Sequence, residues 1–202
     1  GYYYADSTIN GFSDTLLNGT GCGDYGDVLL MPTVGQQSYQ AMGTESQQMA
    51  YASAFSHENE TAEPGSYSVY LDRYQVKAEL SATKRAAIHR YAFPKAADAG
   101  FILDLDYSLQ RQTNEDMVLE VISDTEIRGH KKTLYWACVQ YINFYAKFSK
   151  PFTYTLVTDS MALDADGPRL PTAKVLLQFE TGENEQVLVK VGVSAVDMDG
   201  AR

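Results

Sequence analysis

Residues 11–27 hold the side chains best suited to binding a polar ligand. Five glycines fall within these seventeen residues, together with Asp14, Cys22 and Asp24. Glycine tolerates positive φ and lets another molecule approach the backbone closely, while carboxylates accept hydrogen bonds from hydroxyl groups. The stretch leads directly into the apolar run at 28–32, so it is a shaped loop on a strand, a common place for a binding surface. A tight surface turn is the alternative, with Asp24 bonding its own backbone.

A second pair with chemical potential is Arg85 and His89. Alternating residues of a strand over 83–91 would share one face, which includes Thr83, Arg85, His89 and Tyr91. Four residues of strand separate the two side chains by about 13 Å, so they would not touch but could line one groove. The alternative is that Arg85 and His89 each pair with a nearby carboxylate at the rim of the sheet and bind no ligand.

The sequence gives only weak evidence for a metal-binding site or for a catalytic nucleophile. The run His57-Glu58-Asn59-Glu60 lacks a second histidine or cysteine at a ligand spacing, and the acid pair Asp104 and Asp106 is explained by turn solvation. Residues 164–167 have the first spacings of a calcium loop but not its later glutamate. No Gly-x-Ser-x-Gly elbow occurs, and the chain has only three histidines. We therefore predict no catalytic residue and no metal site within this chain.

Short alternating apolar runs predict an all-β fold. Turn residues separate them, and no helical pattern of comparable length intervenes, which favours one antiparallel β-sandwich domain over residues 1–202. Residues 95–100 are expected to form a loop. The predicted strands are 27–32, 66–71, 76–83, 84–93, 101–105, 117–122, 126–130, 138–148, 152–157, 173–179 and 186–193.

Composition and charge limit the partners. The net charge is −10, and the densest basic group is Lys131-Lys132, which argues against nucleic acid or an anionic membrane surface as a partner. No apolar run is long enough for a membrane-spanning helix, and no signal peptide is recognised. The two cysteines, Cys22 and Cys138, permit one disulfide but do not establish it.

Eight segments, in order along nearly the whole chain, resemble the N-terminal domain of the glycoside hydrolase family 92 α-mannosidases. No single segment is specific for this family, but the occurrence of all eight in the same order is. The segments are GYYYADSTINGFS at 1–13, NGTGCGDYGDVLLMP at 18–32, FSHENE at 55–60, PGSY at 64–67, ELSATKR at 79–85, HRYAFP at 89–94, AKFSKPF at 146–152 and VKVGVSAV at 189–196.

The resemblance implies a large galactose-mutarotase-like supersandwich that precedes an (α/α) barrel. It implies that the parent protein is a calcium-dependent, inverting α-mannosidase whose catalytic carboxylates and calcium belong to the barrel. The chain begins inside a motif, so we expect its first strands and the following catalytic domain to be missing and this portion alone to be inactive. A secreted, periplasmic or cell-surface location is implied by the resemblance alone.

The resemblance also implies that this domain covers the sugar site from one side. The expected substrate-binding residues are Asp14, Gly21, Cys22, Asp24, Arg85 and His89. The partners would be an α-mannoside glycan and the chain's own C-terminal catalytic domain. One departure concerns Ser13-Asp14-Thr15-Leu16, where the family commonly has Ser-His-Thr-His. A stand-alone carbohydrate-binding sandwich and a structural or adhesion domain are the alternatives.

Overall fold

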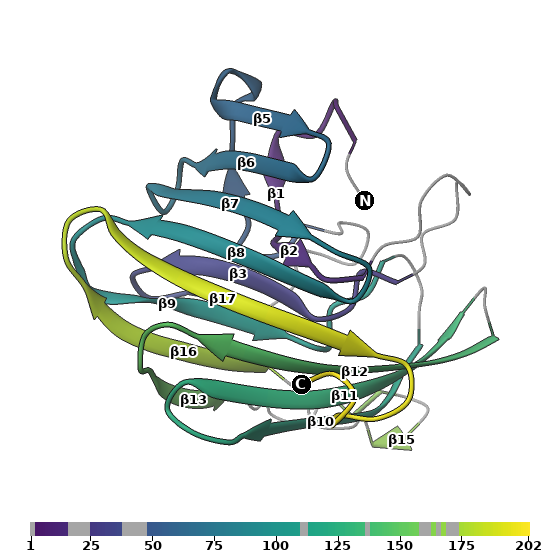
Figure 1. Ribbon diagram of the computed structural model, residues 1–202. Coiled ribbons are helices and arrows are strands. Elements are labelled where there is room, and N and C mark those ends of the chain that lie inside the picture. Colours follow the sequence, from purple (N-terminus) through teal and green to yellow (C-terminus); the bar gives the residue numbers. More distant parts are fainter. Residues whose placement is uncertain are drawn as a thin grey trace.

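Two antiparallel β-sheets lie face to face in the computed structural model of the chain (Figure 1). The structure describes residues 3–15, 25–37, 48–109, 113–135, 138–157, 163–164, 167–168 and 174–202. Within these ranges the chain is almost entirely strand and loop, with one 3₁₀ turn, η1 (His57–Asn59). The predicted all-β, antiparallel β-sandwich is confirmed.

The larger sheet has eight strands in the order β10-β11-β12-β17-β8-β7-β6-β5. In chain order they are β5 (Glu60–Glu63), β6 (Ser66–Leu71), β7 (Val76–Ala82), β8 (Ala86–Phe93), β10 (Thr113–Val121), β11 (Glu126–Tyr135), β12 (Cys138–Phe148) and β17 (Glu185–Ser194).

The smaller sheet has five strands in the order β13-β16-β9-β3-β2. Two short pairs, β1 with β4 and β14 with β15, accompany the two sheets. The strands outside the larger sheet are β1 (Thr8–Ile9), β2 (Phe12–Ser13), β3 (Leu29–Val34), β4 (Ser53–Ala54), β9 (Ala96–Asp104), β13 (Thr153–Val157), β14 (Leu163–Asp164), β15 (Gly167–Pro168) and β16 (Lys174–Thr181).

Period-two alternation assigns each strand a buried and an open face. On β17, Val187, Val189 and Val191 are buried, whereas Leu188 and Lys190 face outward. Strand β9 differs, because its last six residues are all buried. Strand β9 lies between β16 and β3 in the smaller sheet. The prediction of a loop over 95–100 is wrong, because β9 begins at Ala96. The small residues at 96–100 pair with β16 and so are strand despite their weak pattern.

The centre of the core is an aromatic cluster around Phe101 of β9. Its ring centroid lies 5.0 Å from that of Tyr91, 5.5 Å from Phe93 and 5.6 Å from Phe148, all on the larger sheet. Tilted and edge-to-face contacts of this kind contribute beyond the apolar area they bury. Phe101 therefore joins the two sheets.

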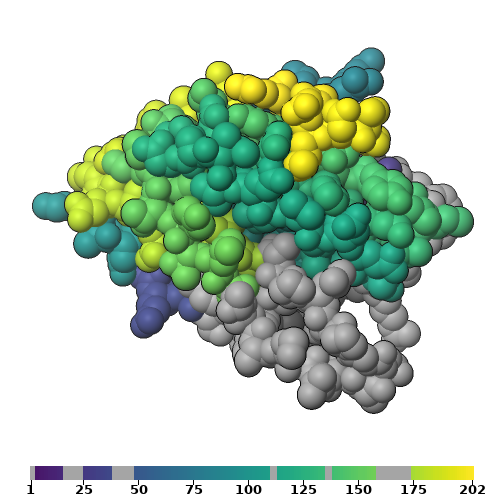
Figure 2. Space-filling model, turned by 90° about the horizontal axis from the view of Figure 1, so that it is seen from below, coloured from purple at the N-terminus to yellow at the C-terminus, as the bar shows by residue number. Residues whose placement is uncertain are grey.

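The C-terminal residues fold back onto the larger sheet. A Cβ added to Gly192 would lie 2.0 Å from the Ala201 carbonyl oxygen, so only glycine allows this approach. Arg202 lies over the Tyr145 ring at 5.5 Å, and Asp199 pairs with Arg128 at 3.4 Å. Figure 2 shows this segment in yellow, lying against the neighbouring strands.

None of the described residues forms a helix with the length and apolarity needed to span a bilayer.

We expect Phe101→Ala to lower the free energy of unfolding by about 3–5 kcal/mol, because a fully buried ring that touches both sheets is replaced by a cavity. Urea denaturation measures the change. Tyr154→Ala is the matched control, since this ring on β13 is 52% exposed and should change stability by no more than about 0.5 kcal/mol. Equal effects of the two substitutions would contradict the assignment of Phe101 to the centre of the core.

Candidate functional site

The two ends of the glycine-rich stretch meet at a point that we call the loop neck: Asp14, Thr15, Gly26 and Asp27. The Gly26 backbone N–H donates to the Thr15 carbonyl at 3.1 Å, and the Asp27 backbone N–H donates to Thr15 Oγ1 at 2.8 Å. The Thr15 hydroxyl also lies 3.4 Å from Asp27 Oδ2. Residues 15 and 26–27, at the two ends of this stretch, are therefore held next to each other.

A buried ion pair holds one side of the neck. Lys131 Nζ of β11 lies 2.8 Å from Asp27 Oδ1, and both side chains are fully buried. The same ammonium donates to the Tyr107 carbonyl at 2.6 Å. Because a lone buried charge is costly, each group depends on its partner. Asp27 lies two residues before β3 of the smaller sheet, so the pair links the two sheets at the neck.

A second acid–base contact holds the other side. His89 Nε2 of β8 lies 3.1 Å from Asp14 Oδ1, and each side chain is 2% exposed. His89 Nδ1 lies 2.9 Å from the Tyr91 hydroxyl. Burial, and then the Asp14 charge, raise the pKa of Tyr91, so this hydroxyl stays protonated and can donate to Nδ1. A ring with its proton on Nε2 then satisfies both contacts.

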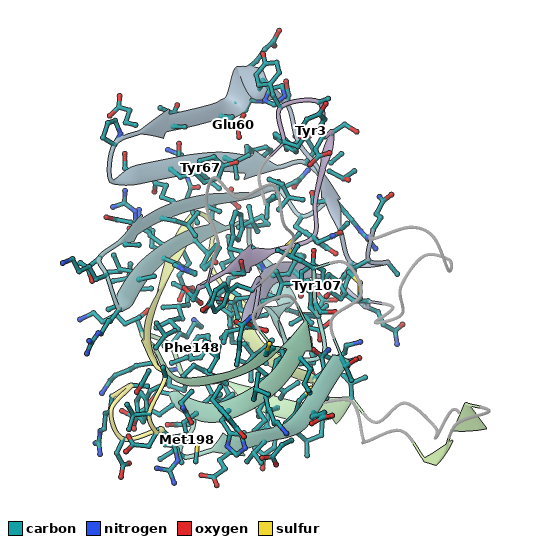
Figure 3. The ribbon with its side chains drawn as sticks, turned by 90° about the vertical axis from the view of Figure 1, so that its right-hand side faces the viewer. Tyr3, Glu60, Tyr67, Tyr107, Phe148 and Met198 are labelled. Atoms are coloured by element: carbon teal, nitrogen blue, oxygen red, sulfur yellow. The ribbon has the colours of Figure 1, made fainter. Side chains whose placement is uncertain are left out.

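A third polar cluster lies next to the neck, at the end of β9. Asp104 accepts from the Tyr51 hydroxyl at 2.7 Å and from the Tyr107 backbone N–H at 2.9 Å. Lys174 Nζ lies 3.6 Å from Asp104 and 3.7 Å from Asp106. Burial raises the pKa of Asp104, and the nearby Lys174 charge partly offsets that rise. Tyr107 thus connects this cluster to Lys131, because its backbone bonds to both Asp104 and Lys131. Tyr107 is labelled in Figure 3.

These carboxylates do not fit a calcium site. Calcium needs several free oxygen ligands, whereas the Asp104 oxygens already accept hydrogen bonds and face an ammonium group. Across the described ranges, no three histidine, cysteine or acidic side chains gather closely enough to hold a metal ion.

The backbone at the neck is strained. Tyr25 and Val28 have φ values of 65° and 57°, and Gly26 lies between them at 86°. A left-handed conformation is unusual for any side chain and rare for a β-branched one. A Cβ at Gly26 would also lie 2.7 Å from Leu109. Such strain persists only where surrounding contacts hold it, and the buried Asp27–Lys131 pair supplies such a contact.

The structure places the predicted substrate-binding residues in different surroundings. Asp14 and His89 meet directly, although their side chains are buried in the neck. Arg85 is exposed in the bend before β8, since this strand starts at Ala86 and is shorter than predicted. Arg85 is thus open to solvent, whereas the His89 side chain is buried. Gly21, Cys22 and Asp24 lie outside the described residues, so their role stays a prediction. A bridge from Cys22 to the exposed Cys138 also stays an open question.

Sequence reasoning missed Asp27 and Lys131. Asp27 is at the end of the glycine-rich stretch, and Lys131 is part of a Lys-Lys pair that resembles solvated surface charge. An alternating strand over 126–135 places Lys131 on the same face as the buried Ile127, and this parity was the available signal.

A separate cluster fixes the N-terminal segment. His57 Nδ1 lies 2.5 Å from Glu60 Oε2, and Nε2 lies 2.8 Å from the Tyr4 carbonyl. The Tyr4 ring stacks on the imidazole at 4.2 Å, and Tyr67 donates to Glu60 at 2.6 Å. Figure 3 labels Glu60 and Tyr67 on their adjacent strands. Both partners of the ring are acceptors, so this geometry requires a proton on each nitrogen.

Comparison with protein families places the chain. The model of the glycosyl hydrolase family 92 N-terminal domain matches residues 1–194, so the chain belongs to glycosyl hydrolase family 92. No curated protein matches the chain.

Solved structures agree with this placement. The family GH92 α-mannosidase BT3965 from Bacteroides thetaiotaomicron is 31% identical, with a TM-score of 0.83, and has also been solved in complex with mannoimidazole. The GH92 glycosyl hydrolase ccman5 is 28% identical, with a TM-score of 0.77. Each comparison covers 100% of this chain but 28% of the other, so this chain spans just over a quarter of these relatives. The inverting mannosidase BT2199 from the same species is 22% identical over 99% of this chain and 26% of its own, with a TM-score of 0.75, and supports the fold.

We expect Lys131→Met to lower the free energy of unfolding by about 3–5 kcal/mol, because it leaves Asp27 buried without its counter-charge. The double variant Asp27→Leu with Lys131→Met should recover much of that loss. The control is Lys147→Met, which breaks a pair with Glu126 at a 61% exposed lysine and should cost less than about 1 kcal/mol. A mild effect of Lys131→Met in urea titrations would show that the neck does not depend on the pair.

The His57 cluster should lose its stabilising effect at alkaline pH. Its bonds to Glu60 and to the Tyr4 carbonyl raise the pKa of His57 above the ordinary value of 6.5. A raised folded-state pKa gives stabilisation that is complete below about 6.5 and declines as the pH passes the folded value. NMR titration of the ring should give a pKa above 6.5, and the Tm difference between wild type and His57→Gln should shrink from pH 6 to pH 9. A ring that titrates below 6.5 would contradict the doubly bonded geometry.

Proposed function

We propose that this chain serves as the N-terminal domain of a calcium-dependent, inverting α-mannosidase that hydrolyses α-mannosides. One observation carries the proposal: the family match over residues 1–194, together with 31% identity to an α-mannosidase across the whole chain. In this proposal the enzyme acts outside the cytoplasm, as a secreted, periplasmic or cell-surface protein, where it meets glycan substrates.

The chemistry would be divided between two domains. Inverting hydrolysis uses one carboxylic acid to protonate the leaving oxygen and one carboxylate to activate water, about 6.5–9.5 Å apart. The buried carboxylates of the neck are held by His89 and Lys131 and are therefore suited to a positioning role. We assign the acid, the base and the calcium to the following catalytic domain, where bound calcium would supply electrostatic stabilisation of the sugar.

The contribution of this chain would be to hold the glycine-rich loop against the sugar. A loop of this composition presents backbone N–H and C=O groups to sugar hydroxyls at close range. Its ends are fixed by two buried contacts, Asp14 with His89 and Asp27 with Lys131, so the loop starts from a rigid base. Gly21, Cys22 and Asp24 remain the proposed sugar contacts, with Arg85 at the rim.

The test compares the 202-residue chain with the longer native protein, using an activated aryl α-mannoside. We expect turnover by the longer protein, loss of turnover with a calcium chelator and recovery when calcium is added. The isolated chain should show no more turnover than a heat-denatured sample. Turnover by the isolated chain would overturn the division of chemistry, and an inactive longer protein with intact folding would overturn the assigned activity.

A further inference from the structure

A shallow trough crosses the outer face of the larger sheet, opposite the inner face that supplies His89 and Lys131 to the loop neck. One depression of about 430 Å³ is lined by Glu58, Asn59, Thr61, Ser68, Tyr70 and Lys77. A second, of about 360 Å³, lies beside it, and the two share Thr61 and Ser68. Together they form one continuous trough, which we call the outer trough.

The strand register places the floor of the outer trough in a straight row. Thr61 of β5 lies opposite Ser68 of β6, Ser68 opposite Glu79 of β7, Glu79 opposite Arg90 of β8, and Arg90 opposite Leu188 of β17. Figure 1 shows these strands side by side. Four steps between adjacent strands span roughly 19 Å, which leaves room for several linked sugar rings.

The charges in the outer trough nearly cancel. Arg90 Nε lies 2.7 Å from Glu79, and Lys77 Nζ lies 3.3 Å from the same carboxylate. With Glu58 at the rim, two cations face two acids, so the trough does not attract a strongly anionic ligand such as nucleic acid or a sulfated polymer. The exposed apolar surface comes from Ile88, which is 41% exposed, and from the half-buried Tyr67, Leu80 and Leu188. That area is small for a lipid or an apolar peptide.

The remaining lining suits a neutral ligand that is rich in hydroxyl groups. Hydroxyl, amide, carboxylate and ammonium groups supply donors and acceptors, and the half-buried Tyr70 supplies a ring with a polar tip. The serine and threonine residues of the lining are Thr61, Ser66, Ser68 and Ser81.

The rim of the outer trough is held in place. Glu58 and Asn59 belong to η1, where the Ser56 side chain accepts from the Glu58 backbone N–H and His57 bonds to Glu60 and Tyr4. A rim that is already ordered loses little conformational entropy when a ligand binds.

We propose that the outer trough is a second, non-catalytic binding site for a neutral polysaccharide chain. The site is separate from the sugar contacts assigned to the glycine-rich loop and needs no residue of the loop neck. It would keep a polymeric glycan on the protein while a chain end is processed elsewhere.

Affinity electrophoresis of the 202-residue chain tests the proposal, with soluble yeast mannan and dextran as neutral probes and heparin as the anionic comparison. We expect at least one neutral polymer to retard the protein and heparin to have no effect. Ser68→Lys places a long side chain opposite Glu79, where its charge is tolerated, and blocks the junction of the two depressions. It should raise the Kd for the neutral polymer by about tenfold or more.

Two matched controls lie on the smaller sheet. Thr155→Lys on β13 adds the same charge at an exposed site and should leave retardation unchanged. Tyr70→Ala should weaken binding, whereas Tyr154→Ala on β13 should not. Circular dichroism and Tm establish that each variant is folded, and mobility is compared with that of the same variant in a sugar-free gel.

Several outcomes would overturn the proposal that the outer trough binds a neutral polysaccharide. These are no retardation by either neutral polymer, equal retardation of Ser68→Lys and Thr155→Lys, and retardation by heparin alone. Loss of retardation in Asp14→Asn but not in Ser68→Lys would also overturn it and would assign binding to the loop end. Such a result leaves the proposed mannosidase function intact, because that function is tested by turnover of the longer protein.

Discussion

The buried ion pair between Asp27 and Lys131 is the constraint on which this end of the molecule depends. Neither charge is exposed, and the lysine also donates a hydrogen bond to the Tyr107 backbone carbonyl. Since an uncompensated buried charge costs several kcal/mol, β11 and the segment before β3 must stay together. This requirement fixes the separation of the two sheets at the neck and allows the backbone of Tyr25 and Val28 to remain left-handed.

The two sheets are therefore joined by two different kinds of interaction. In the middle of the sandwich the contact is apolar, and the ring of Phe101 meets Tyr91, Phe93 and Phe148. At the loop neck the contact between the sheets is made by polar, directional interactions. Apolar contacts tolerate small shifts, whereas a buried acid–base contact holds its atoms within a narrow range of distance and angle. A protein that must present a loop to a partner domain or ligand gains positional accuracy from the second kind.

The two proposed roles use different surfaces of one sheet system. The inner face of the larger sheet supplies His89 and Lys131 to the loop neck, while the outer face of the same sheet carries the row from Thr61 to Leu188. Strand alternation makes this possible, because neighbouring residues such as His89 and Arg90 point to opposite faces. A glycan held on the outer face would leave the loop end free for the catalytic domain.

The sequence by itself determined the fold class and the family, because alternating apolar runs and the ordered motifs are local features of the chain. Alternation also predicted that His89 and Tyr91 share a face. It did not show that Asp14 pairs with His89, or Asp27 with Lys131, because these partners are separated by long stretches of chain and their contact depends on how the sheets stack. Only the tertiary structure showed that Lys131 is buried while Arg85 is exposed, since burial of a charge depends on the partner that the fold provides.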